Sequence, residues 1–206
     1  MTRSRRSGPR YVSDLIPSPD SLLLAAHDLA VALADLDLTP TFIGGVAVSL
    51  VAQPRFTEDL DALIVFDTAQ AETLLAVLAS HGFKPRYRDM VELAVSARMI
   101  TVEHESTGTA VDIALGCMPF EEEVLQRSVT HDSSGITLQL PTPEDLVILK
   151  STANRPKDRD DIRTIGRVYP NLDRDRMRFW VEQYGEVLEK PELWLEVEGL
   201  LNYSKG

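Results

Sequence analysis

The sequence predicts an α+β fold, in which a mixed β-sheet flanked by helices is followed by a C-terminal helical unit. Over residues 41–66, a short apolar strand, two glycines, a helix and a second apolar strand follow one another. Strand-like alternation then dominates residues 84–115, and beyond residue 141 the apolar residues recur at helical spacing. We therefore expect a sheet-containing core over residues 18–140 and a helical unit over residues 141–206.

The individual elements follow from hydrophobic periodicity and from capping residues. A segment with four arginines precedes them at residues 1–17 and is predicted to be a flexible basic tail. Helices are predicted over residues 18–35, 46–52, 67–81, 120–127, 142–152, 174–184 and 191–201, with a further charged helix after a break at residues 154–156. Strands are predicted over residues 41–43, 60–66, 91–95, 97–104, 110–115 and 136–140, with a hairpin turn at residues 106–108.

Composition limits the class of protein and its compartment. The 206 residues are 44% hydrophobic, which is enough for a buried core in a chain of this length. The single cysteine, Cys117, excludes an intramolecular disulfide, and there is no run of about 18 apolar residues to span a bilayer. We therefore expect a cytoplasmic protein without a membrane partner. The four histidines lack metal-ligand spacing, and the P-loop and His-Glu-x-x-His motifs are absent.

The charge distribution bears on nucleic-acid binding. A formal net charge of −11 argues against a protein that coats nucleic acid. Residues 150–178, however, hold nine Lys or Arg and five Asp, a local balance of +4. Such a segment can bind a nucleotide or an RNA end. A helix surface with internal salt bridges explains the same composition, and charge alone favours that alternative.

Two aspartates on the second predicted strand are the first candidate site residues. Asp59 and Asp61 are two residues apart, so their side chains leave the same face of a strand while Leu60 points to the other face. Carboxylates about 6–7 Å apart on one strand face are suited to anchor a pair of magnesium ions. The alternative is a pair of solvated acids on an exposed strand.

The residues just before this acid pair supply the features of a phosphate site. Gly44 and Gly45 end a strand and open a helix, where free backbone N–H groups and the absence of a Cβ allow a phosphate to approach. Thr57 shares the aspartate face if the strand is already extended there, and Arg55 supplies a nearby cation. The alternative is a corner whose glycines only permit a tight turn. The glycine pair and the acid pair together favour the catalytic interpretation.

A third carboxylate, Asp112, lies in the otherwise apolar stretch of residues 109–115. A buried carboxylate without a partner is costly, so a specific partner is expected. That partner is either a hydrogen bond from a neighbouring loop or a metal ion shared with Asp59 and Asp61. The nearby Asp-x-Asp strand favours the metal ion.

Three segments together resemble the nucleotidyltransferase superfamily, which has the polymerase-beta-like fold. They are Ile43-Gly44-Gly45, then Arg55-Phe56-Thr57-Glu58-Asp59-Leu60-Asp61, then Leu146 to Lys150 followed by Arg155-Pro156-Lys157-Asp158 and Asp161-Ile162. The third segment is similar to the bacterial branch that includes abortive-infection and toxin–antitoxin nucleotidyltransferase toxins. The resemblance covers most of residues 40–165 and implies a nucleotidyltransferase-type mixed sheet.

The resemblance also implies roles for individual residues. Those implied to hold the triphosphate are Gly44, Gly45 and Thr57. Those implied to bind two magnesium ions are Asp59, Asp61 and Asp112. Those implied to surround the nucleotide are Lys150, Lys157 and Asp158. The sequence departs from many members, which have serine where Gly45 or Thr57 stands, and its helical tail has no motif that can be matched.

The implied activity is magnesium-assisted transfer of a nucleoside monophosphate from an NTP, such as ATP, to an acceptor hydroxyl, with release of pyrophosphate. Asp112 is expected to assist deprotonation of the acceptor, and Lys150 to neutralise developing phosphate charge. RNA, for example a tRNA end, is the predicted acceptor, and the toxin relatives imply a cognate antitoxin protein as a partner. The alternatives are a small-molecule transferase of the aminoglycoside-modifying type and a catalytically silent nucleotide-binding module.

Overall fold

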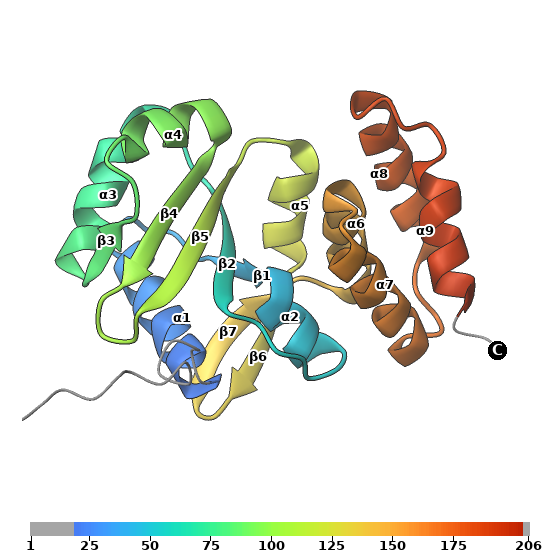
Figure 1. The fold of residues 1–206 in the computed structure, drawn as a ribbon, viewed down its shortest axis with the longest axis horizontal. Coiled ribbons are helices and arrows are strands. Elements are labelled where there is room, and N and C mark those ends of the chain that lie inside the picture. Colours follow the sequence, from blue (N-terminus) through green and yellow to red (C-terminus); the bar gives the residue numbers. More distant parts are fainter. Residues whose placement is uncertain (1–18, 204–206) are drawn as a thin grey trace, which may run out of the picture.

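A computed structural model describes residues 19–203 of the chain, so the predicted basic tail at residues 1–17 lies outside the described part. Figure 1 shows a sheet with its helices, coloured blue to yellow, beside a group of helices coloured orange to red. This arrangement confirms the predicted α+β class, with a mixed sheet followed by a helical unit. None of the helices in the described range is long and apolar enough to cross a membrane.

The described strands form one seven-stranded sheet with the order β3-β4-β5-β2-β1-β7-β6. The strands are β1 (Thr41–Ile43), β2 (Asp59–Val65), β3 (Phe83–Pro85), β4 (Met99–His104), β5 (Thr109–Gly116), β6 (Val129–Ser133) and β7 (Ile136–Leu140). β2 pairs parallel with β5 and antiparallel with β1, and β1 pairs parallel with β7. The sheet is therefore mixed, and the strand with the two predicted acids lies at its centre.

The helices surround this sheet and continue beyond it. They are α1 (Pro19–Ala34), α2 (Gly44–Val51), α3 (Ala71–Ser80) after a 3-10 turn at Thr68–Gln70, α4 (Met90–Ala97), α5 (Pro119–Arg127), α6 (Pro143–Ala153), α7 (Pro156–Val168), α8 (Arg174–Val187) and α9 (Leu193–Asn202). The predicted start of α6 is confirmed, because the Thr142 side chain accepts a hydrogen bond from the Asp145 backbone N–H.

The predicted strand over residues 91–95 is wrong, because this segment lies within helix α4. Met90 and Ala94 are buried four residues apart, as on one face of a helix, whereas Val95 is exposed. A short apolar run does not distinguish a strand from a helix by periodicity alone. Arg98 has a left-handed backbone (φ 50°) that ends the helix just before β4.

Sequence periodicity also fails to predict the two edge strands, β3 and β6. β3 is three residues long and contains Lys84 and Pro85, and β6 consists mainly of polar residues. Both strands lie at the ends of the strand order, where only one side is paired. Edge strands are commonly short, charged or interrupted by proline, so they lack the apolar alternation of a central strand.

Alternation along β2 separates the hydrophobic core from the candidate site. The even-numbered residues from Leu60 to Ile64 are fully buried on one face of the strand. Asp59 and Asp61 leave the other face. The start of α2 lies over this second face, because Gly44 approaches the Asp61 side chain.

The helical unit is fixed to the core by a buried carboxylate and by an aromatic contact. Asp145, at the start of α6, is fully buried and forms ion pairs with Arg127 of α5 at 3.1 Å and with Arg176 of α8 at 2.8 Å. Tyr184 of α8 packs edge-on against Phe120 of α5. Burial raises the pKa of Tyr184 to about 12, so its hydroxyl stays neutral. These contacts hold α6 and α8 against the sheet-containing half.

Candidate active site

The turn between β1 and α2 requires glycine at two positions. Gly44 has a positive φ of 66°, and a Cβ built on it would overlap Oδ2 of Asp61. A Cβ on Gly45 would overlap the Thr57 hydroxyl and come within 3.1 Å of the Arg55 guanidinium. The Gly45 backbone N–H donates to the Asp61 carboxylate. The glycines therefore bring the backbone against three side chains, which is more than a tight turn alone needs.

Gly44→Ala is expected to destabilise the protein by clearly more than Gly82→Ala. Gly82 has a similar positive φ of 78°, but no heavy atom lies within 4 Å of an added Cβ. The left-handed backbone costs about 1–2 kcal/mol at either position, and the overlap with Asp61 adds about 1–3 kcal/mol at Gly44 only. Urea unfolding of both variants measures the difference. Equal losses would show that Asp61 is not held against Gly44.

Asp112 extends the row of acids across the sheet. β2 and β5 run parallel in a register that places Asp61 opposite Asp112, and directly opposed residues point to the same face. Oδ1 of Asp112 is buried and has no hydrogen-bond partner among the described residues. Asp59 leaves the same face as Asp61 and is exposed. The hydrogen bond that was the alternative explanation for Asp112 is therefore not formed at this oxygen.

The negative charges of Asp61 and Asp112 are not fully neutralised by a neighbouring cation. Burial raises the pKa of Asp61 and the negative charge of Asp112 raises it further, while Lys150 acts in the opposite direction. Within residues 19–203, no group of three or more His, Cys, Asp or Glu side chains is arranged to hold a metal ion. Magnesium is commonly held by one or two carboxylates together with water and substrate phosphates. The free oxygen of Asp112 and the raised pKa of Asp61 fit that kind of site.

Lys150 of α6 is buried between two carboxylates of α7. Its Nζ lies 3.2 Å from Oδ1 of Asp158 and 3.0 Å from Oδ2 of Asp161. Asp158 is fully buried, and its Oδ2 accepts a hydrogen bond of 2.7 Å from Arg155 Nε. Burial alone would raise the pKa of Asp158, but Arg155 and Lys150 lower it overall. Both oxygens of Asp158 are thus engaged inside the protein, and Lys150 reaches Asp61 through its charge.

Arg55 enters the site from the loop between α2 and β2. Its Nη2 donates to Oδ2 of Asp161 at 3.0 Å, and its Nε lies 2.9 Å from Oδ1 without a well-aligned N–H. Ser49 fixes the loop, because its hydroxyl donates to the Arg55 carbonyl and accepts from the Arg55 backbone N–H. The guanidinium is therefore held between the glycine turn and α7.

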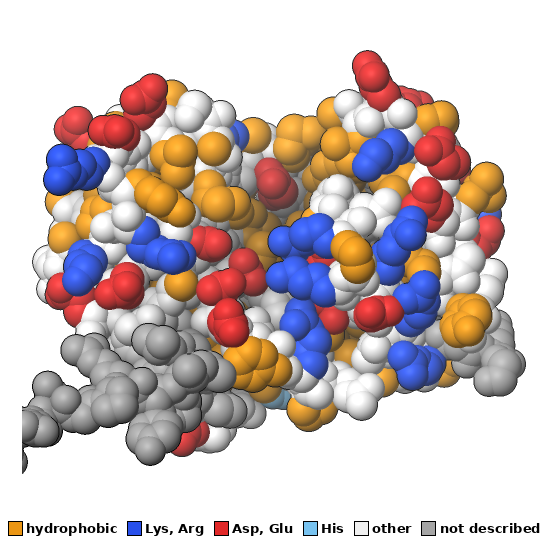
Figure 2. Space-filling view, viewed as in Figure 1, with side chains coloured by type: hydrophobic (Ala, Val, Ile, Leu, Met, Phe, Trp, Pro, Cys, Tyr) orange, Lys and Arg blue, Asp and Glu red, His pale blue; other side chains and the backbone are white. Residues whose placement is uncertain are grey.

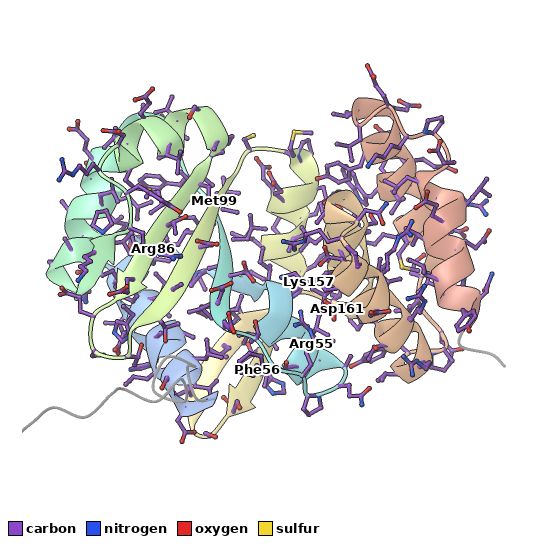
Figure 3. The ribbon with its side chains drawn as sticks, viewed as in Figure 1. Arg55, Phe56, Arg86, Met99, Lys157 and Asp161 are labelled. Carbon is purple, nitrogen blue, oxygen red and sulfur yellow. The ribbon has the colours of Figure 1, made fainter. Side chains whose placement is uncertain are left out.

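Figures 2 and 3 show the surroundings of this site. Arg55 lies beside Asp161 of α7, whereas Arg86 and Met99 lie on the side of β4. Figure 2 shows a hollow between the two halves of the molecule, with hydrophobic side chains in its floor. At the borders of the hollow, Lys and Arg side chains gather on the side of the C-terminal helices, and Asp and Glu side chains on the side of the sheet. The cations of the helical unit thus face the acids across this hollow.

Two residues of the site, Arg155 and Asp161, lie in the third segment that resembles the nucleotidyltransferases, but the sequence assigns neither of them a role. The hydrogen bond to Asp158 raises the pKa of Arg155, and the negative charge of Asp61 acts in the same direction, so Arg155 lies within electrostatic reach of the acid row. The three-residue spacing of Asp158 and Asp161 places both on one face of a helix, which is a signal that could have indicated Asp161. For Arg155 the signal in the sequence is its place at the start of that third segment.

A glycine turn that faces a row of strand carboxylates in a mixed sheet agrees with the resemblance to nucleotidyltransferases. A family model described as "Nucleotidyl transferase of unknown function (DUF2204)" matches residues 24–192, and the chain belongs to this family. No curated protein matches the sequence. The predicted superfamily and enzyme class are confirmed, whereas the narrower toxin branch stays a prediction.

Solved structures share the fold. The chain is similar to an antigenic nucleotidyltransferase-like protein from Paracoccidioides brasiliensis, with 20% sequence identity and a TM-score of 0.53 over 89% of this chain and 94% of that chain. It is also similar to the lincomycin-bound lincosamide antibiotic adenylyltransferase LnuA, with 14% identity and a TM-score of 0.50 over 73% of this chain and 97% of that chain. At these identities the likeness concerns the fold.

Proposed function

We propose that this nucleotidyltransferase moves a nucleoside monophosphate from an NTP to an acceptor hydroxyl in a magnesium-dependent reaction that releases pyrophosphate. The observation that carries the proposal is the pair of opposed carboxylates, Asp61 and Asp112, which lies against the glycine turn and has a buried oxygen without a partner among residues 19–203. A triphosphate requires N–H donors and cations, and magnesium requires carboxylates. The same corner of the fold offers both.

On the nucleotide side, the triphosphate is bound by groups around the start of α2. Because Gly44 and Gly45 lack a Cβ, the start of α2 lies close against Thr57 and Arg55, so that backbone N–H groups, a hydroxyl and a guanidinium are gathered at one corner for a phosphate. Lys150 keeps a positive charge near the acid row and counters the charge that develops on the phosphate. These residues bind and orient the phosphates without taking part in proton transfer.

On the acceptor side, Asp112 accepts the proton of the attacking hydroxyl, since its Oδ1 has no other partner in the described part of the chain. Asp59, Asp61 and Asp112 are the residues that would hold magnesium, which when bound polarises the attacked phosphate. Lys157, which is exposed, contacts the nucleotide directly. Asp158 acts indirectly by holding the neighbouring cations, since both its oxygens are engaged.

RNA, for example a tRNA end, is the acceptor that we propose first, in a toxin with a cognate antitoxin. The resemblance to nucleotidyltransferase toxins supports this choice, and so do the cations beside the hollow. Arg155, the residue before α7, and Lys157 in the first turn of α7 are both exposed. Cations in these positions suit the phosphates of a nucleic-acid end.

A small-molecule acceptor is the second candidate, because most cations of the helical unit are already paired. The cations of α7, α8 and the residue before α7 form the pairs Arg155–Asp158, Arg159–Glu196, Arg163–Asp160, Arg176–Glu123 and Arg178–Glu198. Such pairing is what a helix surface with internal salt bridges predicts. It leaves fewer unpaired cations to bind RNA phosphates. The similar LnuA structure, described as an antibiotic adenylyltransferase, supports the same candidate.

Transfer of label from each of the four α-labelled NTPs tests the proposal. Total RNA, a lincosamide and an aminoglycoside serve as acceptors with magnesium, and wild type is compared with Asp59→Ala. A labelled RNA band that the variant loses supports RNA as the acceptor, and a labelled antibiotic supports the second candidate. NTP binding without transfer to any acceptor would favour the silent nucleotide-binding module and contradict the proposal.

A further inference from the structure

Asp161 of α7 is a buried carboxylate to which the proposed reaction assigns no role. Only 4% of the residue is exposed. Its two oxygens lie against two cations from different parts of the fold, Arg55 of the α2–β2 loop and Lys150 of α6. α7 also contacts both α2 and α6. Asp161 therefore joins the helical unit to the loop that borders the glycine turn.

The junction between α6 and α7 explains how Asp161 reaches both cations. Asn154 has a left-handed backbone (φ 45°) that ends α6, and Pro156 begins α7. This reversal brings one face of α7 back toward α6, so that Asp158 and Asp161 both contact Lys150. Because Asp158 already neutralises the charge of Lys150, Asp161 is not needed for that neutralisation alone.

The Arg55 guanidinium, held by Asp161, lies beside the glycine turn. Its Nη2 donates to Asp161 and is also the atom that a Cβ on Gly45 would meet at 3.1 Å, next to the Thr57 hydroxyl. The Arg55 side chain is 28% exposed and has several rotatable bonds. A carboxylate that lies against both Nε and Nη2 restricts these rotations in advance of ligand binding.

We propose that Asp161 is a positioning residue for triphosphate binding, which holds the Arg55 guanidinium over the corner formed by Gly45 and Thr57. This inference rests on the proposed function. A carboxylate near a phosphate site also weakens the local positive potential. If Asp161 were only a counter-ion, its neutralisation would strengthen triphosphate binding, whereas loss of positioning weakens it. The two effects have opposite signs, so a measured affinity distinguishes them.

Asp161→Asn keeps the size of the side chain and removes its charge. Calorimetric titration with ATP, GTP, CTP and UTP, each with magnesium and without an acceptor, is expected to give about tenfold weaker binding of the nucleotide that wild type binds best. Asp160→Asn is the matched control, because Asp160 is exposed and pairs with Arg163 away from Arg55. It should keep wild-type affinity. Unchanged or tighter binding by a folded Asp161→Asn variant overturns the inference.

Arg55→Lys provides a second test that does not depend on the folding of Asp161→Asn. It keeps the positive charge but loses the contact of two nitrogens with Asp161, so it should weaken binding about as much. The double variant should bind little more weakly than either single variant, because both remove the same contact. Full affinity in Arg55→Lys, or losses that multiply in the double variant, overturns the inference. A wild-type protein that binds none of the four NTPs refutes the proposed function itself.

Discussion

Asp61→Asn should abolish nucleotide transfer while leaving the protein folded. We expect the rate to fall about 1,000-fold or more, because the substitution removes the negative charge of Asp61. This carboxylate lies between Asp59 and Asp112, the residues proposed to hold magnesium against the attacked phosphate. Burial and the charge of Asp112 both raise the pKa of Asp61, so the ionised carboxylate is disfavoured in the folded protein. Removing it should leave the unfolding temperature in metal-free buffer unchanged or higher at neutral pH.

Two measurements check this expectation. Label transfer at saturating magnesium gives the rate, and thermal unfolding with and without magnesium and NTP gives ligand stabilisation, which wild type should show and the variant should largely lose. Glu72→Gln, a neutralised exposed acid on α3, is the matched control and should keep the wild-type rate. Transfer by Asp61→Asn within tenfold of wild type would remove Asp61 from the catalytic assignment.

The sheet side of the site can be predicted from the sequence because it depends on local spacing. Strand alternation puts Asp59 and Asp61 on one face, and the glycine pair marks the opening of a helix. The apolar surroundings of Asp112 indicate that this carboxylate is unusual. They do not reveal that it lies opposite Asp61, because that register depends on the pairing of β2 with β5. Local pattern thus identifies the acids, and only the fold brings them together.

The helical side of the site cannot be predicted in the same way. Asp161 is one of many charged residues in α7, and its importance depends on Arg55, which lies 106 residues earlier. Likewise, the local balance of residues 150–178 does not show which cations are already paired, since Arg159 pairs with Glu196 of a different helix. Long-range ion pairs leave no periodic signature in a sequence.

Secondary structure shows the same division between local and long-range information. The start of α6 follows from Thr142 and Pro143, whose capping roles are local. In α4, by contrast, Val91 and Val95 are apolar yet exposed, so apolar spacing does not follow burial. A prediction that treats every hydrophobic residue as buried therefore fails in α4.

Lys150→Met should cause the largest loss of stability among the variants considered. The substitution keeps a similar chain length but leaves the buried carboxylates of Asp158 and Asp161 without their shared ammonium group. Breaking a buried ion pair by removing one partner costs about 3–5 kcal/mol. Urea unfolding at pH 7 without ligands measures the loss. Lys157→Met, at an exposed position of the next helix, is the matched control and should change the free energy of unfolding by no more than about 0.5 kcal/mol.

The pH dependence of this loss identifies its electrostatic part. In wild type, Arg155 and Lys150 hold the pKa of Asp158 below its ordinary value of 3.8, so ionised Asp158 contributes stability above that pH, and the contribution is lost as the pH falls through the folded-state value. Without Lys150 the pKa of Asp158 rises, because two of the interactions that favour the ionised form are gone. The deficit of Lys150→Met should therefore shrink as the pH falls from 7 toward 3.8 and below. A deficit that stays constant over this range would show that Lys150 stabilises the fold by packing rather than by charge.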